Sequence, residues 1–595
     1  MTEQSRFAGR VEAFLAEFFR LYPLHATAAG MHAHDSAWPD LSETGRRARL
    51  AFLARWEGEL AAVADDDLTR DEQIDRDLLN GELDGLRFGE TDLRQEAWDP
   101  LEWVYLLGGG IFPLLAREFA PLAARLTSIA GRLEGIPAVV HAAREVIVGT
   151  PDRPVSRFHT ETALGQLAGV GELADDAVRE AEGAAAEDPS VAAVLPRLRQ
   201  AAALAKAALA DLETHLREVV LPRSDGEGRL GAALFTAKMR HTLRDDELTP
   251  TRILERADRE YAAVRAEMIR LAGELWPTWC PDRERPASDD TLVRAVLDAI
   301  GTEHQRGEDL LDWCRAELGR VEAFCRERDL VGLAADPLEI RWTPVFLRAF
   351  GGAMLDTPGP LDKGQKAFFA ITPIPDEWTA DQAESYLRED NDRMLRVLTI
   401  HEAVPGHYLQ GSYANQNPSI ARGVFWSGVY AEGWATYVTQ VMMDKGYGAE
   451  DPALMLVHWK FYLRAATNAM IDVRIHAGEA FGGPMTEDEA VRMMVDGGFQ
   501  EEAEARNKWN RARLSSTQLS TYFVGSMAMW ELELAARRRL AEAAAGPGAA
   551  AAVVERALPG GLGETPGFSY RRHLETVMLQ GALPVALLRR SILDD

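Results

Sequence analysis

The sequence predicts a mainly α-helical protein with two lobes and a small β-sheet. The chain has 595 residues, which exceeds the size at which a single hydrophobic core stops growing, so two lobes are expected. Apolar residues make up 47% of the chain and charged residues 27%, a composition typical of globular proteins. Much of the chain is rich in Ala, Leu, Arg and Glu, with apolar residues recurring at intervals of three and four, which indicates helices.

In chain order, this periodicity predicts helices over 44–65, 115–146, 160–219, 250–275 and 383–404. The helical period fails between about 329 and 376, where glycines and prolines separate three short runs typical of strands. We expect a small sheet there, with strands at Leu338–Trp342, Ala353–Leu355 and Ala367–Thr372. The predicted lobes are a helical N-terminal lobe, 1–230, and a catalytic lobe, 231–595, containing the sheet and the candidate site.

The charge and composition restrict the possible partners and location. The net charge is −28, and so acidic a surface repels phosphate backbones, which argues against nucleic acid. No run of about 20 apolar residues occurs, so we expect no membrane span. The N-terminus lacks the pattern of a secretory signal, and three widely spaced cysteines form neither a zinc motif nor a disulfide framework. We expect a cytoplasmic monomer or homodimer.

A candidate metal site lies at the end of the predicted helix 383–404. His401 and Glu402 are adjacent, and His407 follows six positions after His401. Imidazole is the commonest zinc ligand, and a glutamate beside the first histidine is the general base of the helical H-E-x-x-H zinc peptidases. On an unbroken helix the two histidines would lie roughly 120° apart. Pro405 and Gly406 favour a broken or widened turn that returns His407 to the side of His401.

The third ligand predicted is Glu432, because catalytic zinc usually has three protein ligands and an open position. Glu432 lies in a largely apolar helical run, 424–443, where a carboxylate is costly unless it is paired or bound to a metal. Small residues around it, including Gly433, would let this helix approach its neighbour closely. The alternatives are a helix-terminal histidine with a loop histidine, and a Glu432 paired with an arginine.

The segments HEAVPGHYLQ and YAEGWATY resemble those of the bacterial "domain of unknown function 885" proteins. Further matches are Asp472-x-Arg474-Ile475-His476 and Gln518-x-x-x-Tyr522-x-x-Gly525. That family is similar to helical zinc peptidases such as oligopeptidases and dipeptidyl peptidase III. The resemblance implies a zinc-peptidase-like architecture with a deep cleft, His401, His407 and Glu432 as ligands, and Glu402 as base. This chain departs from the family's usual Pro-Gly at Ser516-Thr517.

Further residues are candidates for other roles, of which Tyr522 and His476 lie in the matching blocks. Tyr522 and His476 are candidates to donate a hydrogen bond to the oxyanion of a tetrahedral intermediate, with a core tyrosine and a structural histidine as the alternatives. Arg474 and Arg511 are candidates to hold a substrate carboxylate, or else are structural ion-pair partners. Gln410 and Asp472 are expected to orient ligand histidines, and the strand Ala367–Thr372 to pair with an extended substrate.

We therefore predict a peptidase with one Zn²⁺ per chain that hydrolyses peptide or related amide bonds in small substrates. The ligand set also suits manganese or cobalt, although its geometry favours zinc. Two alternatives stay open at this stage. One is a zinc hydrolase of a non-peptide amide or ester, and the other is a non-catalytic helical scaffold.

Overall fold

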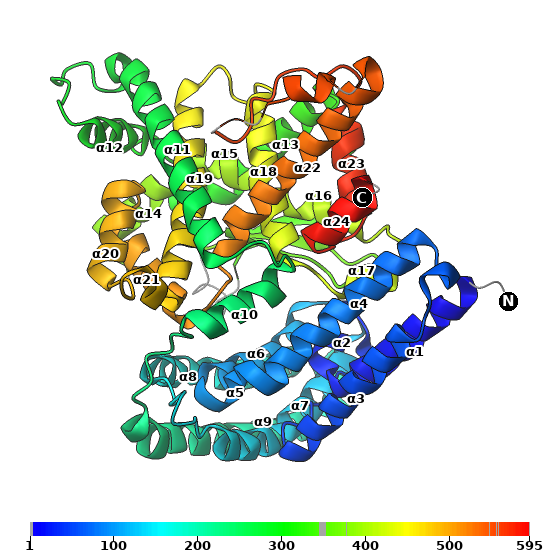
Figure 1. Ribbon diagram of the computed structural model, residues 1–595. Coiled ribbons are helices and arrows are strands. Elements are labelled where there is room, and N and C mark those ends of the chain that lie inside the picture. The colour runs from blue at the N-terminus through cyan, green and yellow to red at the C-terminus, as the bar shows by residue number, and fades with distance from the viewer. Residues whose placement is uncertain are drawn as a thin grey trace. The chain divides into compact units, whose positions relative to one another are not determined.

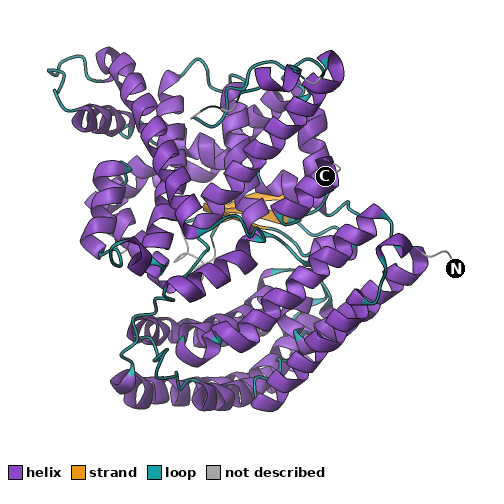
Figure 2. Ribbon diagram, viewed as in Figure 1, coloured by secondary structure: helices purple, strands orange, loops and turns teal. Residues whose placement is uncertain are grey.

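A computed structural model describes residues 4–343, 353–375, 378–546, 548–554, 556 and 558–593. The predicted fold class is confirmed: the chain is mainly helical with one small sheet in its described part (Figures 1 and 2). It divides into two compact units, one of residues 1–229 with 358–365 and the other of residues 230–357 with 366–595. The predicted boundary at residue 230 lies at the first junction, whereas the segment 358–365 was not anticipated.

The N-terminal unit is built from helices whose apolar faces pack together. Several begin at a side chain that caps the first turn, such as Ser42, Thr69 and Ser156, which satisfies backbone N–H groups that have no partner in the helix. The helices are α1 (Gln4–Leu21), α2 (Pro23–Ala29), α3 (Glu43–Ala61), α4 (Arg70–Phe88), α5 (Gln95–Trp98), α6 (Leu101–Ala116), α7 (Leu122–Val146), α8 (Arg157–Ala184) and α9 (Pro189–His215).

The segment Pro358–Gln365 packs with the N-terminal helices although its neighbours in sequence belong to the other unit. The backbone N–H of Leu361 donates to the carbonyl of Ala29 at 2.9 Å, and Asp362 contacts His32 at 3.3 Å. Gly30 has φ +84°, and a Cβ there would lie 2.6 Å from the backbone nitrogen of Asp362. A glycine is therefore needed both for the conformation and for the close approach.

The C-terminal unit contains the remaining helices and the sheet. Its long helix α19 is buried along most of its length and contacts α11, α15 and α22. The helices are α10 (Ala232–Leu243), α11 (Pro250–Trp279), α12 (Asp289–Ile300), α13 (Leu310–Glu327), α14 (Ala380–Glu389), α15 (Asp392–Glu402), α16 (His407–Ala414), α17 (Ile420–Val424), α18 (Gly428–Asp444), α19 (Pro452–His476), α20 (Glu487–Arg492), α21 (Glu502–Leu514), α22 (Ser520–Ala545), α23 (Tyr570–Leu579) and α24 (Val585–Leu593).

The sheet has three strands, β1 (Leu338–Trp342), β2 (Ala353–Asp356) and β3 (Ala367–Ile371), close to the bounds predicted. Its order is β1-β3-β2, with β1 parallel and β2 antiparallel to β3. The core beside it includes Leu310 and Cys314 of α13 and Leu395 of α15. Because β3 is hydrogen bonded on both sides, the prediction that this strand pairs with a substrate is wrong.

Two predicted helices are interrupted by capping residues. The region 383–404 divides into α14 and α15 because the Asn391 side chain accepts hydrogen bonds from the N–H groups of Arg393 and Met394 and so begins a new helix. The region 160–219 divides at Asp188, which caps α9 immediately before Pro189. Each capping residue is a local signal for the start of a new helix. The continuous apolar periodicity around each of them nevertheless predicted a single helix.

Candidate metal centre

The chain between His401 and His407 makes a broken turn, as the Pro-Gly pair predicts. Helix α15 ends at Glu402 and α16 begins at His407. The N–H of Gly406 donates to the carbonyl of Ile400 at 3.0 Å, and a Cβ on Gly406 would lie only 1.8 Å from the carbonyl oxygen of His401. Only glycine fits so close to this helix end, so Gly406 allows the chain to fold back and place both imidazoles on the same side.

Helix α18 supplies the carboxylate opposite the two histidines. The Oε2 atom of Glu432 lies 3.7 Å from Nε2 of His401 and 3.5 Å from Nε2 of His407. The indole nitrogen of Trp434 donates to the carbonyl of Pro405 at 2.9 Å. Trp434 is fully buried, so this bond fixes α18 against the turn that carries His407. This role of Trp434 was not predicted from the sequence.

The three side chains fit a zinc ion. Their nearest ligand atoms all lie within 4.8 Å of one another. Ligands at about 2.1 Å from a tetrahedral zinc lie roughly 3.4 Å apart, close to the 3.5 and 3.7 Å separations between Glu432 and the two imidazoles. Two imidazoles and one carboxylate also match the donors of catalytic rather than structural zinc sites. His401, His407 and Glu432 could therefore hold the metal with little movement.

The site has a strong internal electrostatic coupling. Burial by itself would raise the pKa of Glu432, but the two histidines hold it well below its usual range. Burial by itself would lower the pKa of His407. Glu432 and, after it, Glu402 act in the opposite direction and raise this pKa to about 9. Each group thus stabilises the opposite charge of the other. A divalent cation would take over this role of neutralising the carboxylates.

Glu402 is a buried carboxylate next to this cluster, with a relative exposure of 7%. Within the described ranges no hydrogen bond or ion pair reaches its side chain, and its charge acts on His407. A buried carboxylate normally requires a partner. An unpaired carboxylate beside three converging ligand atoms is the arrangement expected of a general base that acts on water.

Tyr522 reaches the site because two helices cross at a pair of glycines. A Cβ on Gly433 would lie 2.4 Å from the Cα of Gly525, so α18 and α22 meet backbone to backbone. Glu432 precedes one glycine and Tyr522 lies one turn before the other. The two side chains consequently interact: burial raises the pKa of Tyr522 to about 12, and the charge of Glu432 adds to the shift. Tyr522 is therefore protonated near neutral pH.

The Tyr522 hydroxyl is held by two residues of the preceding segment. It accepts from Nη2 of Arg511 at 3.4 Å and from Nε2 of Gln518 at 3.5 Å, and Arg511 also donates to Oε1 of Gln518 at 2.9 Å. A hydroxyl has two lone pairs and one proton. Both acceptor positions face protein donors, so the proton is left to donate to a ligand. Gln518, one turn before Tyr522, was not predicted as a site residue.

Two further residues contact the ligand histidines. The ring of Phe461, on α19, meets that of His401 edge-on at 5.4 Å between centroids. The fully buried side chain of Gln410 interacts with His407 and raises its pKa, and its Nε2 lies 3.5 Å from the carbonyl of Tyr430. The structure thus places Gln410 where a residue that orients His407 would lie.

The structure places His476 and Asp472 differently from the prediction. Nε2 of His476 hydrogen bonds to the carbonyls of Ala512 and Ser515 at 2.9 and 2.8 Å, so it is occupied and supports the loop before α22. Asp472 accepts from Thr517 and from both N–H and O–H of Ser520. It orients the start of the helix that carries Tyr522, rather than a ligand histidine.

Arg474 also lies apart from the cluster. Its charge acts on Glu489 at the start of α20, and its carbonyl accepts from the N–H of Met485. Of the two predicted carboxylate-binding arginines, only Arg511 is connected to Tyr522 in the structure. Sequence alone could not separate them, because in a chain rich in arginine neither position carries a local signal that distinguishes a ligand-binding arginine from an ion-pair partner.

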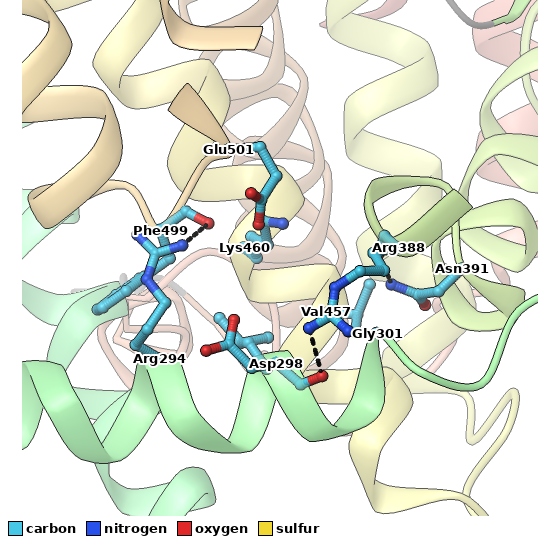
Figure 3. A pocket seen from close by; sticks show the side chains of 10 residues that line it. Arg294, Asp298, Gly301, Arg388, Asn391, Val457, Lys460, Phe499 and Glu501 are labelled. Atoms are coloured by element: carbon cyan, nitrogen blue, oxygen red, sulfur yellow. Dashed lines mark hydrogen bonds between the residues drawn. The ribbon is translucent and has the colours of Figure 1, made fainter. Parts of the chain in front are cut away.

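A separate pocket of the C-terminal unit is polar but internally satisfied (Figure 3). Arg294 donates to the carbonyls of Val495 and Phe499, and Arg388 donates to the carbonyl of Asp298 at 2.9 Å. Lys460 is paired with Glu389 at 2.7 Å. The basic groups that line this pocket therefore bind backbone carbonyls and a carboxylate of the protein itself. The pocket contains none of the metal-cluster residues.

A known protein family matches almost the whole chain. The model of a bacterial protein family of unknown function, DUF885, matches residues 23–592. The chain belongs to this DUF885 family. The family description assigns no activity, and the search of curated proteins finds no match. The sequence resemblance to this family is therefore confirmed.

Two solved structures share the DUF885 fold of this chain. One, from Shewanella oneidensis, is described as "a putative lipoprotein of unknown function"; it is 28% identical, with 99% of each chain covered and a TM-score of 0.78. The other, described as "the putative lipoprotein from Colwellia psychrerythraea", is 16% identical, covers 100% of this chain and 99% of its own, and has a TM-score of 0.78. Among the described helices of the present chain, none is long and apolar enough to cross a membrane.

Proposed function

We propose that this protein is a zinc-dependent hydrolase that cleaves peptide or related amide bonds in small substrates, in the cytoplasm. The observation that carries the proposal is the convergence of His401, His407 and Glu432 beside the unpaired, buried carboxylate of Glu402. A structural zinc site would be closed by a fourth protein ligand and would need no base. Among the described residues three donors converge, which leaves a position open, as water activation requires.

The chain's own residues supply the remaining chemistry. A bound zinc would act as a Lewis acid that polarises the scissile carbonyl and makes a water more acidic. Glu402 would accept the proton of the attacking water and deliver it to the departing amine. The free O–H of Tyr522 would donate to the oxygen that becomes negative during attack. Hydrolysis of a non-peptide amide or ester would use the same groups.

Replacement of the base tests this proposal. Glu402→Gln should keep about one zinc per chain, because Glu402 is not a ligand, and should lower kcat roughly 10²- to 10⁴-fold. Zinc is measured by mass spectrometry of protein purified without an affinity-tag metal, and turnover with a peptide library beside model amides and esters. Glu502→Gln, which removes an exposed charge paired with Arg506 at 2.7 Å on the surface of α21, is the matched control. Turnover of Glu402→Gln near the wild-type rate would refute the mechanism, and zinc without turnover of any substrate would favour a scaffold.

A further inference from the structure

Arg511 differs from Arg506 of the same helix in its contacts. Its guanidinium is exposed and contacts only the neutral groups of Gln518 and Tyr522. Throughout the described part of the chain, no carboxylate lies within ion-pair distance of it. Arg506, on the same helix, is paired with both Glu487 and Glu502. This exposed arginine, without a carboxylate partner among the described residues, lies at the candidate metal centre.

The surroundings of Arg511 favour an anion. Lys508, one turn earlier, is buried and pairs with Glu504 at 3.4 Å. Burial lowers the pKa of Lys508 to about 8, and the positive charges of Arg464 and Arg511 oppose the effect of Glu504. Lys508 is thus paired with Glu504 and Arg464 with Glu389, so among the described residues Arg511 is the basic group of this cluster that has no carboxylate partner. An exposed guanidinium of this kind attracts a negatively charged ligand locally.

The position of Arg511 is fixed relative to the reacting groups. Its Nη2 lies 3.4 Å from the Tyr522 hydroxyl, and Tyr522 interacts with Glu432. The start of α22 is held by three hydrogen bonds to Asp472, and Gln518 also donates to the Tyr522 hydroxyl, so Tyr522 does not depend on Arg511 alone for its position. An extended peptide residue spans about 3.3–3.6 Å. A group bound by Arg511 would thus lie within a few residues of the bond presented to Tyr522 and the metal.

We propose that Arg511 binds the free C-terminal carboxylate of the substrate, so that the enzyme removes residues from the carboxyl end of small peptides. The guanidinium has donors for a carboxylate in a planar, two-point contact. Arg464 is less suited because it is paired with Glu389, and Arg474 lies apart. This inference rests on the proposed hydrolase function and names its substrate class.

Binding to a catalytically silent protein tests the inference separately from turnover. The zinc-loaded Glu402→Gln protein is titrated by calorimetry with N-acetyl-trialanine as the free acid and as its C-terminal amide. We expect the acid to bind at least about 10-fold more tightly than the amide. Adding Arg511→Gln should remove this preference, Arg511→Lys should restore part of it, and Arg506→Gln should leave it unchanged. Thermal unfolding shows whether each variant is folded.

Each result decides one of the two proposals. Equal affinity for acid and amide, no binding of either, or a preference that survives Arg511→Gln would overturn the role of Arg511. Wild-type protein that hydrolyses both peptides equally well would refute this substrate class and leave the hydrolase function standing. A preference for the acid that depends on Arg511, without hydrolysis of any peptide, would support the binding site and refute the peptidase.

Discussion

The C-terminal unit contains two buried clusters of histidine and carboxylate that look alike in sequence but differ in hydrogen bonding. In the first, His401, His407 and Glu432 direct ligand atoms at one another, with Glu402 unpaired beside them. In the second, His476 donates to two carbonyls and Asp472 accepts three hydrogen bonds. The first cluster has three ligand atoms that converge on a common point, whereas in the second Nε2 of His476 and both carboxylate oxygens of Asp472 are bonded to the segment before α22 and to its first residue. The convergence of ligand atoms, rather than the residue types, indicates a functional site.

The largest expected difference between the clusters is in metal binding. His407→Ala should lower zinc affinity by more than about 100-fold, because loss of a direct ligand exceeds the effect of losing an outer partner. His476→Gln should retain about one zinc per chain. Zinc content after dialysis against a weak chelator, measured by mass spectrometry, distinguishes the two. Zinc loss from both variants, or from neither, would mean that the clusters do not differ as described.

A smaller effect is expected when the second cluster is broken. Asp472→Asn replaces one acceptor oxygen by an NH₂ group, which cannot accept from Ser520. The buried N–H at the start of α22 would lose its partner, at a cost of about 1–3 kcal/mol in the free energy of unfolding. Urea denaturation measures this loss, and zinc content should stay unchanged. A variant as stable as the wild type would show that Asp472 does not anchor this helix.

The smallest effect concerns pH. Burial, the largest cause, lowers the pKa of His476, although Asp472 and the two carbonyls act in the opposite direction. The unfolded chain therefore binds this proton more readily, so His476 contributes stability that is present above the unfolded pKa of about 6.5 and declines as pH falls below it. The difference in unfolding free energy between wild type and His476→Gln should shrink from pH 7.5 to pH 5.0, on the order of 1 kcal/mol. A difference that grows on acidification would contradict this sign.

Local sequence signals predicted the residues of the metal site better than the residues that hold them in place. Pro405 and Gly406 indicated the broken turn because each has a restricted or unusual backbone, and an isolated carboxylate in an apolar run indicated Glu432. The contact of Trp434 with Pro405, the bridge made by Gln518, and the position of β3 between two strands depend on residues far apart in sequence. Periodicity carries no information about these contacts. For the same reason, Arg511 and Arg474 were indistinguishable until the fold was known.

The segment Pro358–Gln365 has a consequence for dissecting this protein. Since the chain leaves β2, packs with N-terminal helices and returns to β3, a cut near residue 230 would not yield two self-contained fragments. The fragment beginning at residue 230 would contain the segment Pro358–Gln365 without its partners Ala29, Gly30 and His32, which belong to the other fragment. Expression of either half alone is therefore a poor route to an isolated domain, whereas co-expression of the two halves should allow them to reassemble.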